Sequence, residues 1–244
     1  MNILIVGATS AIANATARRF AKKKPRFCLL ARDIEKMGLI SKDLIIRGAS
    51  DVKCLSIDFT NREQQTSKIE EAFSKYQEFD IVLLCYGFLP DQSQCQASVE
   101  KTIEAIDCNA LSVISFLTTL IPYMEQKKKG TIAVVTSVAG DRGRTNNFVY
   151  GSAKAMVSAY LQGLRGKLAQ SNISVLEIRP GLVDTPMTSH LTKTRLFSTP
   201  EIIGKKIEQG IEKNKTTIYA PGYWRLIMCV VKMIPDRLFM RLKF

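Results

Sequence analysis

The stretch "ILIVGATSAIANAT", residues 3–16, decides the fold prediction because it joins an apolar run to a helical segment through a tight turn. The run 3–6 has the length and composition of a buried strand, and a helix is expected from about residue 11. The backbone N–H groups and the dipole at the start of such a helix suit a pyrophosphate. An ordinary strand-to-helix turn has the same outline, so this stretch alone leaves both interpretations open.

The same alternation of strand and helix continues along the chain. The apolar runs are rich in leucine and β-branched residues without strict alternation, which is typical of strands covered on both faces. Strands alternating with helices predict right-handed crossovers. The expected fold is α/β, a doubly wound Rossmann fold with a single parallel sheet of about seven strands and helices on both faces. Further strands are expected at 27–30, 52–57, 80–85, 131–136, 173–178 and 216–220, and helices at about 11–23, 35–47, 61–78, 98–127, 149–170 and 201–213.

The composition is that of a soluble globular protein, with 244 residues of which 46% are hydrophobic and 23% charged. We expect a dinucleotide-binding and catalytic domain over 1–221 and an amphipathic, basic tail over 222–244. The apolar run after Met1 is too short to span a membrane and has no basic region before it, so no secretory signal is expected. A cytoplasmic protein is therefore predicted.

Histidine and cysteine usage limits the chemistry. The six cysteines have no C-x-x-C spacing, which favours buried thiols over disulfides or a zinc site. His190 is the single histidine, which excludes a multi-histidine metal centre and any Ser/His/Asp triad built elsewhere. We expect no metal site.

The charge balance favours anionic partners. Lys and Arg number 35 against 22 Asp and Glu, a net charge of +13. Phosphorylated small molecules, an anionic membrane surface and nucleic acid would all suit such a chain. The basic residues are dispersed and form no recognised DNA-binding signature, so no nucleic-acid partner is predicted.

Two loops after predicted strands concern a dinucleotide. In the first, Gly7 keeps a glycine of the dinucleotide fingerprint, while Ala11 and Ala13 take later positions. In the second, Ala31 stands where an NAD enzyme places an acid, and Arg32 follows it. A guanidinium there suits a 2′-phosphate, so NADP(H) is favoured over NAD(H), although a solvated surface arginine remains the alternative and Asp33 lies next to it. The first loop is expected to contact the cofactor through Gly7, Thr9, Ser10, Ala11 and Ile12.

A third group lies around the segment "FVYGSAKAM", residues 148–156. Tyr150 and Lys154 are one helical turn apart on the same face, and Ser137 ends the preceding apolar run. By itself such a tyrosine and lysine pair is usually a surface hydrogen bond. The carboxyl ends of parallel strands carry ligand sites, however, and Ser137 is predicted at that edge.

With Asn109 in "DCNALS", these residues resemble the catalytic quartet of the short-chain dehydrogenase/reductase family, and the resemblance covers nearly the whole chain. It implies an NAD(P)-dependent oxidoreductase that interconverts a carbonyl and a secondary alcohol. Tyr150 would protonate the carbonyl oxygen, and the Lys154 ammonium would lower the tyrosine pKa and bind the nicotinamide ribose. Ser137 would orient the carbonyl, and Asn109 would hold a relay water.

The resemblance also assigns cofactor contacts. Asp58 would lie beside the adenine and Gly87 at the turn after the fourth strand. Around the nicotinamide it places Pro180, Gly181, Val183 and Thr185, followed by a substrate lid. Cys85 and Tyr86 replace the family's usual asparagines, and the alanines of the first loop are a second departure. A catalytically silent, dinucleotide-sensing regulator with the same fold is therefore the alternative. A homo-oligomer is implied, paired through the helices that bear Asn109 and Tyr150.

The C-terminal part suggests a substrate and a second partner. "RPGLVDTPMTSHL" and "APGYWRLIMCVVKMIPDRLFMRLKF" resemble the branch that reduces a 2-keto pentose on decaprenyl phosphate, so a lipid-linked sugar joins small-molecule carbonyls as a candidate substrate. Pro235 should divide the tail into two short helices that mix cationic and apolar residues. Such a tail suits an anionic membrane surface, here the inner face of the membrane, or packs on the core or a partner subunit. As an anchor it would be dispensable, and a chain cut after Tyr219 should still fold. Its charged and aromatic residues are Tyr223, Trp224, Arg225, Lys232, Asp236, Arg237, Phe239, Arg241, Lys243 and Phe244.

Overall fold

The computed structural model describes residues 1–242, and within them a single sheet of seven parallel strands confirms the predicted fold. The strand order is β3-β2-β1-β4-β5-β6-β7, so the order reverses between β1 and β4. The strands are β1 (Asn2–Val6), β2 (Arg26–Ala31), β3 (Asp51–Ser56), β4 (Ile81–Leu84), β5 (Gly130–Val135), β6 (Ile173–Pro180) and β7 (Thr217–Ala220).

The central strand β1 explains why the apolar runs lack alternation. Leu4 pairs with Cys28 of β2 on one side and with Val82 of β4 on the other. Successive side chains of β1 enter opposite core layers, Leu4 in one and Ile3 in the other, and both are buried. A strand with two covered faces needs apolar residues at every position.

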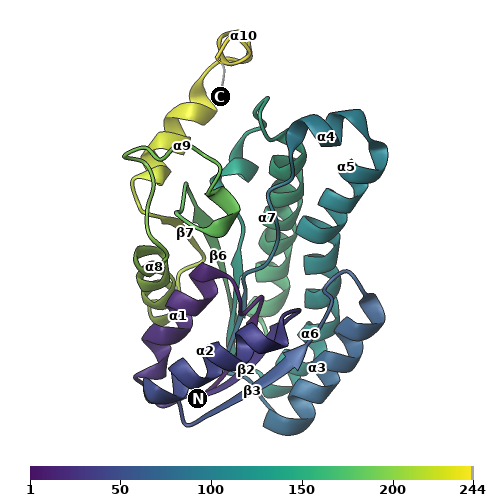
Figure 1. Ribbon diagram of the computed structural model, residues 1–244, viewed down its shortest axis with the longest axis vertical. Coiled ribbons are helices and arrows are strands. Elements are labelled where there is room, and N and C mark those ends of the chain that lie inside the picture. Colours follow the sequence, from purple (N-terminus) through teal and green to yellow (C-terminus); the bar gives the residue numbers. More distant parts are fainter. Residues whose placement is uncertain (243–244) are drawn as a thin grey trace.

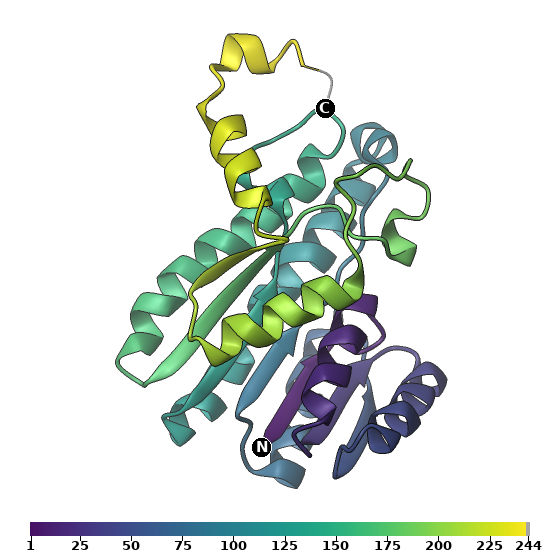
Figure 2. The ribbon, with the colours of Figure 1, turned by 90° about the vertical axis from the view of Figure 1, so that its left-hand side faces the viewer.

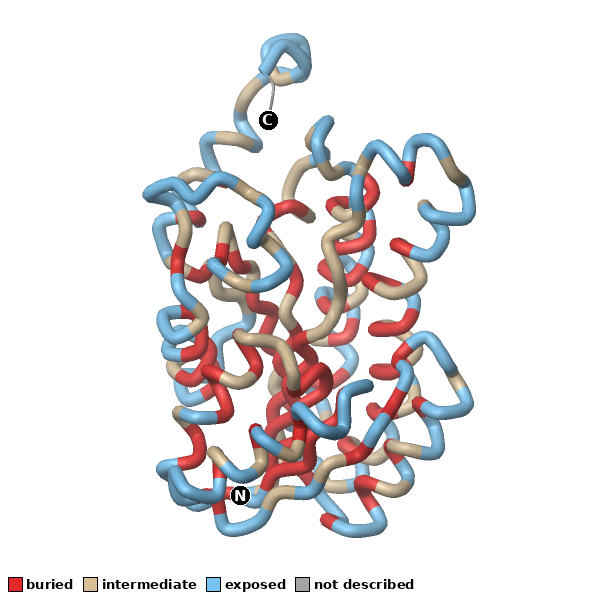
Figure 3. Tube along the Cα trace, viewed as in Figure 1, coloured by how far each residue is buried: buried red, intermediate tan, exposed pale blue. Residues whose placement is uncertain are grey.

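Three helices cover each face of the sheet (Figures 1 and 2). One layer contains α1 (Ala11–Ala21), α2 (Ile34–Ile46) and α8 (Pro200–Glu212), and the other contains α3 (Arg62–Tyr76), α6 (Ser112–Lys127) and α7 (Phe148–Ala169). Buried residues concentrate on the sheet and on the helix faces turned toward it (Figure 3). Apart from α6, these helices agree with the predicted ranges.

The segment predicted as one helix over 98–127 is more complex. After α4 (Gln92–Ala97), which was not predicted, α5 (Val99–Ile106) leads into a π-helical turn, Asp107–Leu111, before α6. The stretch Val99–Lys127 is long and apolar enough to cross a membrane, yet half of its most apolar window is buried inside the molecule. The buried apolar residues of its α6 part, among them Phe116, Leu117 and Leu120, pack on the sheet, as in a core helix.

The C-terminal tail forms two helices on either side of Pro235, as predicted: α9 (Trp224–Met233) and α10 (Asp236–Phe239). They extend beyond the carboxyl ends of the strands (Figure 2). Arg142 donates to the carbonyl oxygens of Val231 and Ile234, which holds the end of α9. The predicted tail residues Lys243 and Phe244 lie outside the described residues.

The first turns of α9 nevertheless pack inside the fold. Trp224 is 5% exposed and Met228 is buried, and both contact Val138 in the short helix Val138–Asp141 that follows β5. The packing alternative of the sequence analysis therefore holds for this part of the tail.

Candidate active site

The carboxyl ends of the central strands border a cavity of about 1190 Å³, at the point where the strand order reverses. Open α/β sheets bind their ligands at this position. The structure brings the predicted residues together here. The cavity is lined by Gly7, Thr9, Ser10, Ala11, Ile12, Arg32, Asp58, Gly87, Ser137, Tyr150, Lys154, Pro180, Gly181, Val183 and Thr185, so of the predicted site only Asn109 lies behind its wall.

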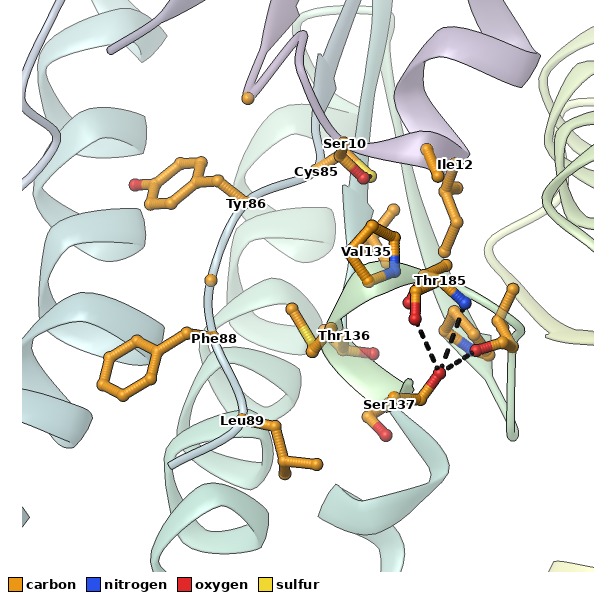
Figure 4. A pocket seen from close by; sticks show the side chains of 18 of the residues that line it. Ser10, Ile12, Cys85, Tyr86, Phe88, Leu89, Val135, Thr136, Ser137 and Thr185 are labelled. Atoms are coloured by element: carbon orange, nitrogen blue, oxygen red, sulfur yellow. Dashed lines mark hydrogen bonds between the residues drawn. The ribbon is translucent and has the colours of Figure 1, made fainter. Parts of the chain in front are cut away.

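The loop after β1 requires a glycine. Gly7 has a φ of +86°, and a Cβ there would lie 2.7 Å from the Cys85 carbonyl oxygen. Ser10 gives no side-chain cap to α1, and its hydroxyl lies 3.3 Å from the Cys85 thiol instead (Figure 4). The N–H groups of Ala11 and Ile12 at the start of α1 are thus available to a ligand, whereas that of Ala13 faces the Cys85 thiol. This arrangement fits the pyrophosphate of a dinucleotide.

The end of β2 carries an unpaired cation. Within residues 1–242, the Arg32 guanidinium makes no ion pair, and it lines the cavity together with Lys36. Asp33 caps α2, since its carboxylate accepts a 2.9 Å hydrogen bond from the Lys36 N–H. Asp58 accepts bonds from the backbone N–H and hydroxyl of Thr60, which lower the pKa of its carboxyl.

Tyr150 and Lys154 stand together on α7. The Lys154 nitrogen lies 5.6 Å from the centre of the Tyr150 ring, and burial lowers the pKa of this lysine to about 8. The predicted lowering of the tyrosine pKa is wrong. Desolvation raises the pKa of Tyr150 to about 12, which outweighs the opposing hydrogen bond with Ser137.

Asn109 is fully buried in the π-helical turn, behind the loop after β4. Its Oδ1 accepts a 3.1 Å bond from the Phe88 N–H, and its Nδ2 donates to the Ala105 carbonyl. A Cβ at Gly87, whose φ is +142°, would lie 2.5 Å from Asn109 Oδ1 and 3.3 Å from the Lys154 nitrogen. Gly87 therefore allows Asn109 and Lys154 to approach each other. π-Helical turns are often found at functional sites.

A buried ionic network holds the segment that begins with Ser137 in place. Asp141 accepts 2.7 Å bonds from Arg179 and from the Tyr219 hydroxyl. Arg179 also binds the fully buried Glu177, and the Ser158 hydroxyl lies 2.6 Å from Glu177 and 3.0 Å from the Lys154 carbonyl oxygen. The network thus joins the backbone near Ser137 to the helix of Lys154.

The segment after β6 forms the opposite wall. The hydroxyl of Thr188 donates to the Val183 carbonyl and accepts from the Thr185 N–H, which closes a short turn. The Trp224 indole lies against Gly181 so closely that a Cβ there would overlap it.

Several cavity residues were not assigned to the site by the sequence analysis, among them Lys36, Arg144, Asn147 and Trp224. Trp224 follows the last strand, and the only available signal was that it is the single tryptophan of the chain. Nowhere in residues 1–242 do three or more His, Cys, Asp or Glu side chains gather as a metal site would require.

Comparison with known proteins identifies the family of the chain. The family model described as short chain dehydrogenase matches residues 1–196. An uncharacterized oxidoreductase from the mprA 5′ region of Streptomyces coelicolor is 31% identical over 99% of this chain and 95% of its own length. An uncharacterized oxidoreductase of Mycobacterium tuberculosis is 26% identical over 96% of this chain and 93% of its own.

Solved structures share the fold. A short-chain dehydrogenase from Sphingobium yanoikuyae in complex with NADPH superposes with a TM-score of 0.82, at 21% identity and over 96% of both chains. An alcohol dehydrogenase from the archaeon Thermococcus sibiricus, complexed with 5-hydroxy-NADP, gives 0.78 at 20% identity, over 89% of this chain and 94% of its own. With the family match over most of its length, the chain belongs to the short-chain dehydrogenase family.

Proposed function

We propose that the protein is an NADP(H)-dependent oxidoreductase that interconverts a carbonyl and a secondary alcohol. The observation that carries this proposal is that Ser137, Tyr150 and Lys154 line the same cavity as the glycine turn and free helix start after β1. A proton donor, a cation and a phosphate-binding turn therefore line one cavity.

The protein's own residues account for the proton. Reduced nicotinamide, when bound, supplies the hydride that reaches the carbonyl carbon. The Tyr150 hydroxyl, protonated at neutral pH, gives its proton to the carbonyl oxygen, and Ser137 holds that oxygen beside it. Lys154 stabilises the phenolate that forms, because its ammonium is buried next to the ring. Asn109 and Lys154 face each other across Gly87, where a water would return the proton.

The preference for NADP(H) rests on the end of β2. Arg32 has no carboxylate partner among the described residues, and Lys36 lines the same part of the cavity. Asp33 is engaged as the cap of α2, so its carboxylate is turned to the helix backbone. Two cations and an engaged acid suit a 2′-phosphate better than a 2′-hydroxyl.

The experiment that tests the proposal is a carbonyl screen with NADPH, followed by NADPH oxidation and product analysis. Turnover of any carbonyl, abolished by Tyr150→Phe, supports the enzyme. Tight NADPH binding without turnover of any carbonyl, lipid-linked keto-sugars included, supports the silent regulator instead. The complete quartet favours the enzyme, since a sensor needs no proton donor.

We place the protein in the cytoplasm and propose that it meets an anionic membrane surface through its tail. Leu226, Val230 and Met233 are 72%, 63% and 77% exposed on α9, and Arg225 and Lys232 are exposed beside them. An exposed apolar face with cations suits the interface of an anionic bilayer. A keto-sugar on a polyprenyl phosphate would be presented at such a surface.

We also propose a homo-oligomer paired through α6 and α7. These helices border a shallow pocket that Ile121, Pro122 and Tyr160 help to line, and Met156 of α7 is exposed. Light scattering on the purified protein tests this proposal, because a monomer at micromolar concentration would contradict it.

A further inference from the structure

Arg144 is a cation of the active-site cavity without a counter-charge. It follows the short helix Val138–Asp141 and lines the cavity. Within residues 1–242 no carboxylate forms an ion pair with it, and its Nε is buried without a hydrogen-bond partner. One terminal nitrogen donates to the Val138 carbonyl at 3.3 Å and lies 4.0 Å from the Met228 sulfur.

The nearest acid cannot serve Arg144. Asp141 is already bound by Arg179 and by the Tyr219 hydroxyl, each at 2.7 Å. Burial correspondingly lowers the pKa of Arg144, because nothing in its surroundings compensates the charge fully. A guanidinium removed from water needs a partner for its charge. Because no carboxylate among residues 1–242 supplies one, the partner must come from the cavity.

Two further residues that line the same cavity carry unpaired polar groups. The Trp224 indole N–H is buried without an acceptor, and the Asn147 amide oxygen is buried without a donor. The three residues are neighbours. The Asn147 N–H donates to the Arg144 carbonyl, and Arg144 contacts Met228, which packs with Trp224 around Val138.

This group is linked to the two segments that carry Ser137 and Tyr150. Val138, which accepts the bond from Arg144, directly follows Ser137. The Asn147 carbonyl oxygen accepts from the Gly151 N–H in the first turn of α7, the turn that carries Tyr150. An anionic group at Arg144 would therefore share one cavity with a carbonyl at Ser137 and Tyr150.

We propose that Arg144 and the indole N–H of Trp224 bind an anionic group, a carboxylate or a phosphate, of the carbonyl substrate. This inference rests on the proposed function and narrows its substrate class to anionic carbonyl compounds. Charge-assisted bonds from a guanidinium are strong where water is excluded, so the subsite selects substrates by charge. The Asn147 side chain completes the subsite, because its amide can be turned so that the NH₂ group rather than the oxygen faces the anion.

Trp224 provides a direct binding test, because it is the single tryptophan. With the cofactor site saturated by NADP⁺, inorganic phosphate and acetate are titrated separately while tryptophan emission is recorded, with sodium chloride at equal ionic strength as the salt control. At least one anion should change the emission saturably. Arg144→Gln should weaken the binding of that anion about 10-fold or more. Arg195→Gln, which removes an exposed arginine outside the cavity lining, should bind like the parent.

A kinetic test uses pairs of ketones in which one member carries an anionic group and the other does not. We would compare 4-acetylbenzoate with its methyl ester, and dihydroxyacetone phosphate with dihydroxyacetone, to distinguish a carboxylate from a phosphate. The ratio of kcat/KM, anionic over neutral, should fall about 10-fold or more in Arg144→Gln, mainly through KM, and recover in part in Arg144→Lys. Should Arg144→Gln fail to fold, Trp224→Phe removes the N–H donor alone and should lower the same ratio about 3-fold to 10-fold.

The outcomes separate the two proposals. Reduction of carbonyls with an unchanged ratio in these variants, or anion effects equal to those of sodium chloride, overturns the subsite. Saturable quenching that Arg144→Gln removes, without turnover of any carbonyl, supports the subsite and contradicts the proposed enzymatic function.

Discussion

Lys154 lies one turn after Tyr150 on α7, with its nitrogen 5.6 Å from the centre of the tyrosine ring, and burial moves the two pKa values in opposite directions. The phenol has a pKa of about 12 and the ammonium one of about 8. At neutral pH the pair therefore holds a protonated tyrosine beside a charged lysine, which is the state that protonation of a carbonyl requires.

The first prediction concerns the proton donor. Tyr150→Phe should lower kcat by about 100-fold to 10,000-fold, because it deletes the hydroxyl and keeps the ring. NADPH affinity, measured by nicotinamide fluorescence, should change little, whereas loss of Lys154 should weaken binding as well. Residual turnover near that of the parent would contradict the role of Tyr150.

The second prediction is a pH profile. Deprotonation of Lys154 removes the charge that stabilises the phenolate, so kcat/KM for NADPH, which reports the free enzyme, should fall as the pH rises through about 8. Tyr150 cannot cause this decrease, because its pKa of about 12 keeps it protonated there. Lys154→Arg, if active, should lose the inflection. A profile that stays flat well above pH 8 would exclude the assignment.

The third prediction is that NADPH is preferred over NADH through Arg32. Arg32→Ala should raise the KM for NADPH about 10-fold or more, the worth of a lost charge-assisted bond, and leave the KM for NADH nearly unchanged. NADH serves as the internal control, since it lacks the 2′-phosphate. Equal KM values for NADPH and NADH in the parent protein would show that Arg32 is a surface charge without a role in cofactor choice.

The fourth prediction tests the contact between the tail and the site. Gly181→Ala places a Cβ on the Trp224 indole, so it should shift tryptophan emission and destabilise the protein by about 1–3 kcal/mol through overpacking. Gly143→Ala is the matched control, because a Cβ there meets no atom within 4 Å. Differential scanning fluorimetry should separate the two variants by several degrees. Identical melting would mean that the indole is not held against Gly181.

The fifth prediction concerns the outer face of α9. Replacing Leu226, Val230 and Met233 by serine should abolish co-sedimentation with phosphatidylglycerol vesicles and leave the melting temperature nearly unchanged, since these residues are exposed. Binding by the parent should weaken with salt. Failure of the parent to bind such vesicles at low salt would contradict the proposed membrane binding. A cut after Tyr219 is the poorer test, because it also removes the buried Trp224 and Met228.

Periodic features of this chain were predictable from its sequence. Each strand and the helices that cover the sheet follow from apolar runs alternating with helical segments, because burial on both faces leaves a continuous apolar signature. The predicted cavity residues come together for the same reason, since the carboxyl ends of parallel strands share one edge.

Features that depend on distant partners were not predictable. The π-helical turn at Asn109 leaves no mark in a pattern of apolar residues, and it is explained by the bonds of Asn109 to the loop after β4. The pKa of Tyr150 depends on how much water the folded cavity removes. Trp224 contacts Gly181 from beyond the last strand. A local sequence pattern does not predict where the chain packs once its sheet is complete.

The ionic network beneath Ser137 also bears on the order in which activity appears during synthesis. Asp141 is held by Arg179 and Tyr219, which come 38 and 78 positions later in the chain. A domain generally folds as a unit. A nascent chain that has emerged only through α7 already carries the glycine turn, Tyr150 and Lys154, yet the segment that begins at Ser137 still lacks both anchors. Catalytic competence must therefore await the last strand.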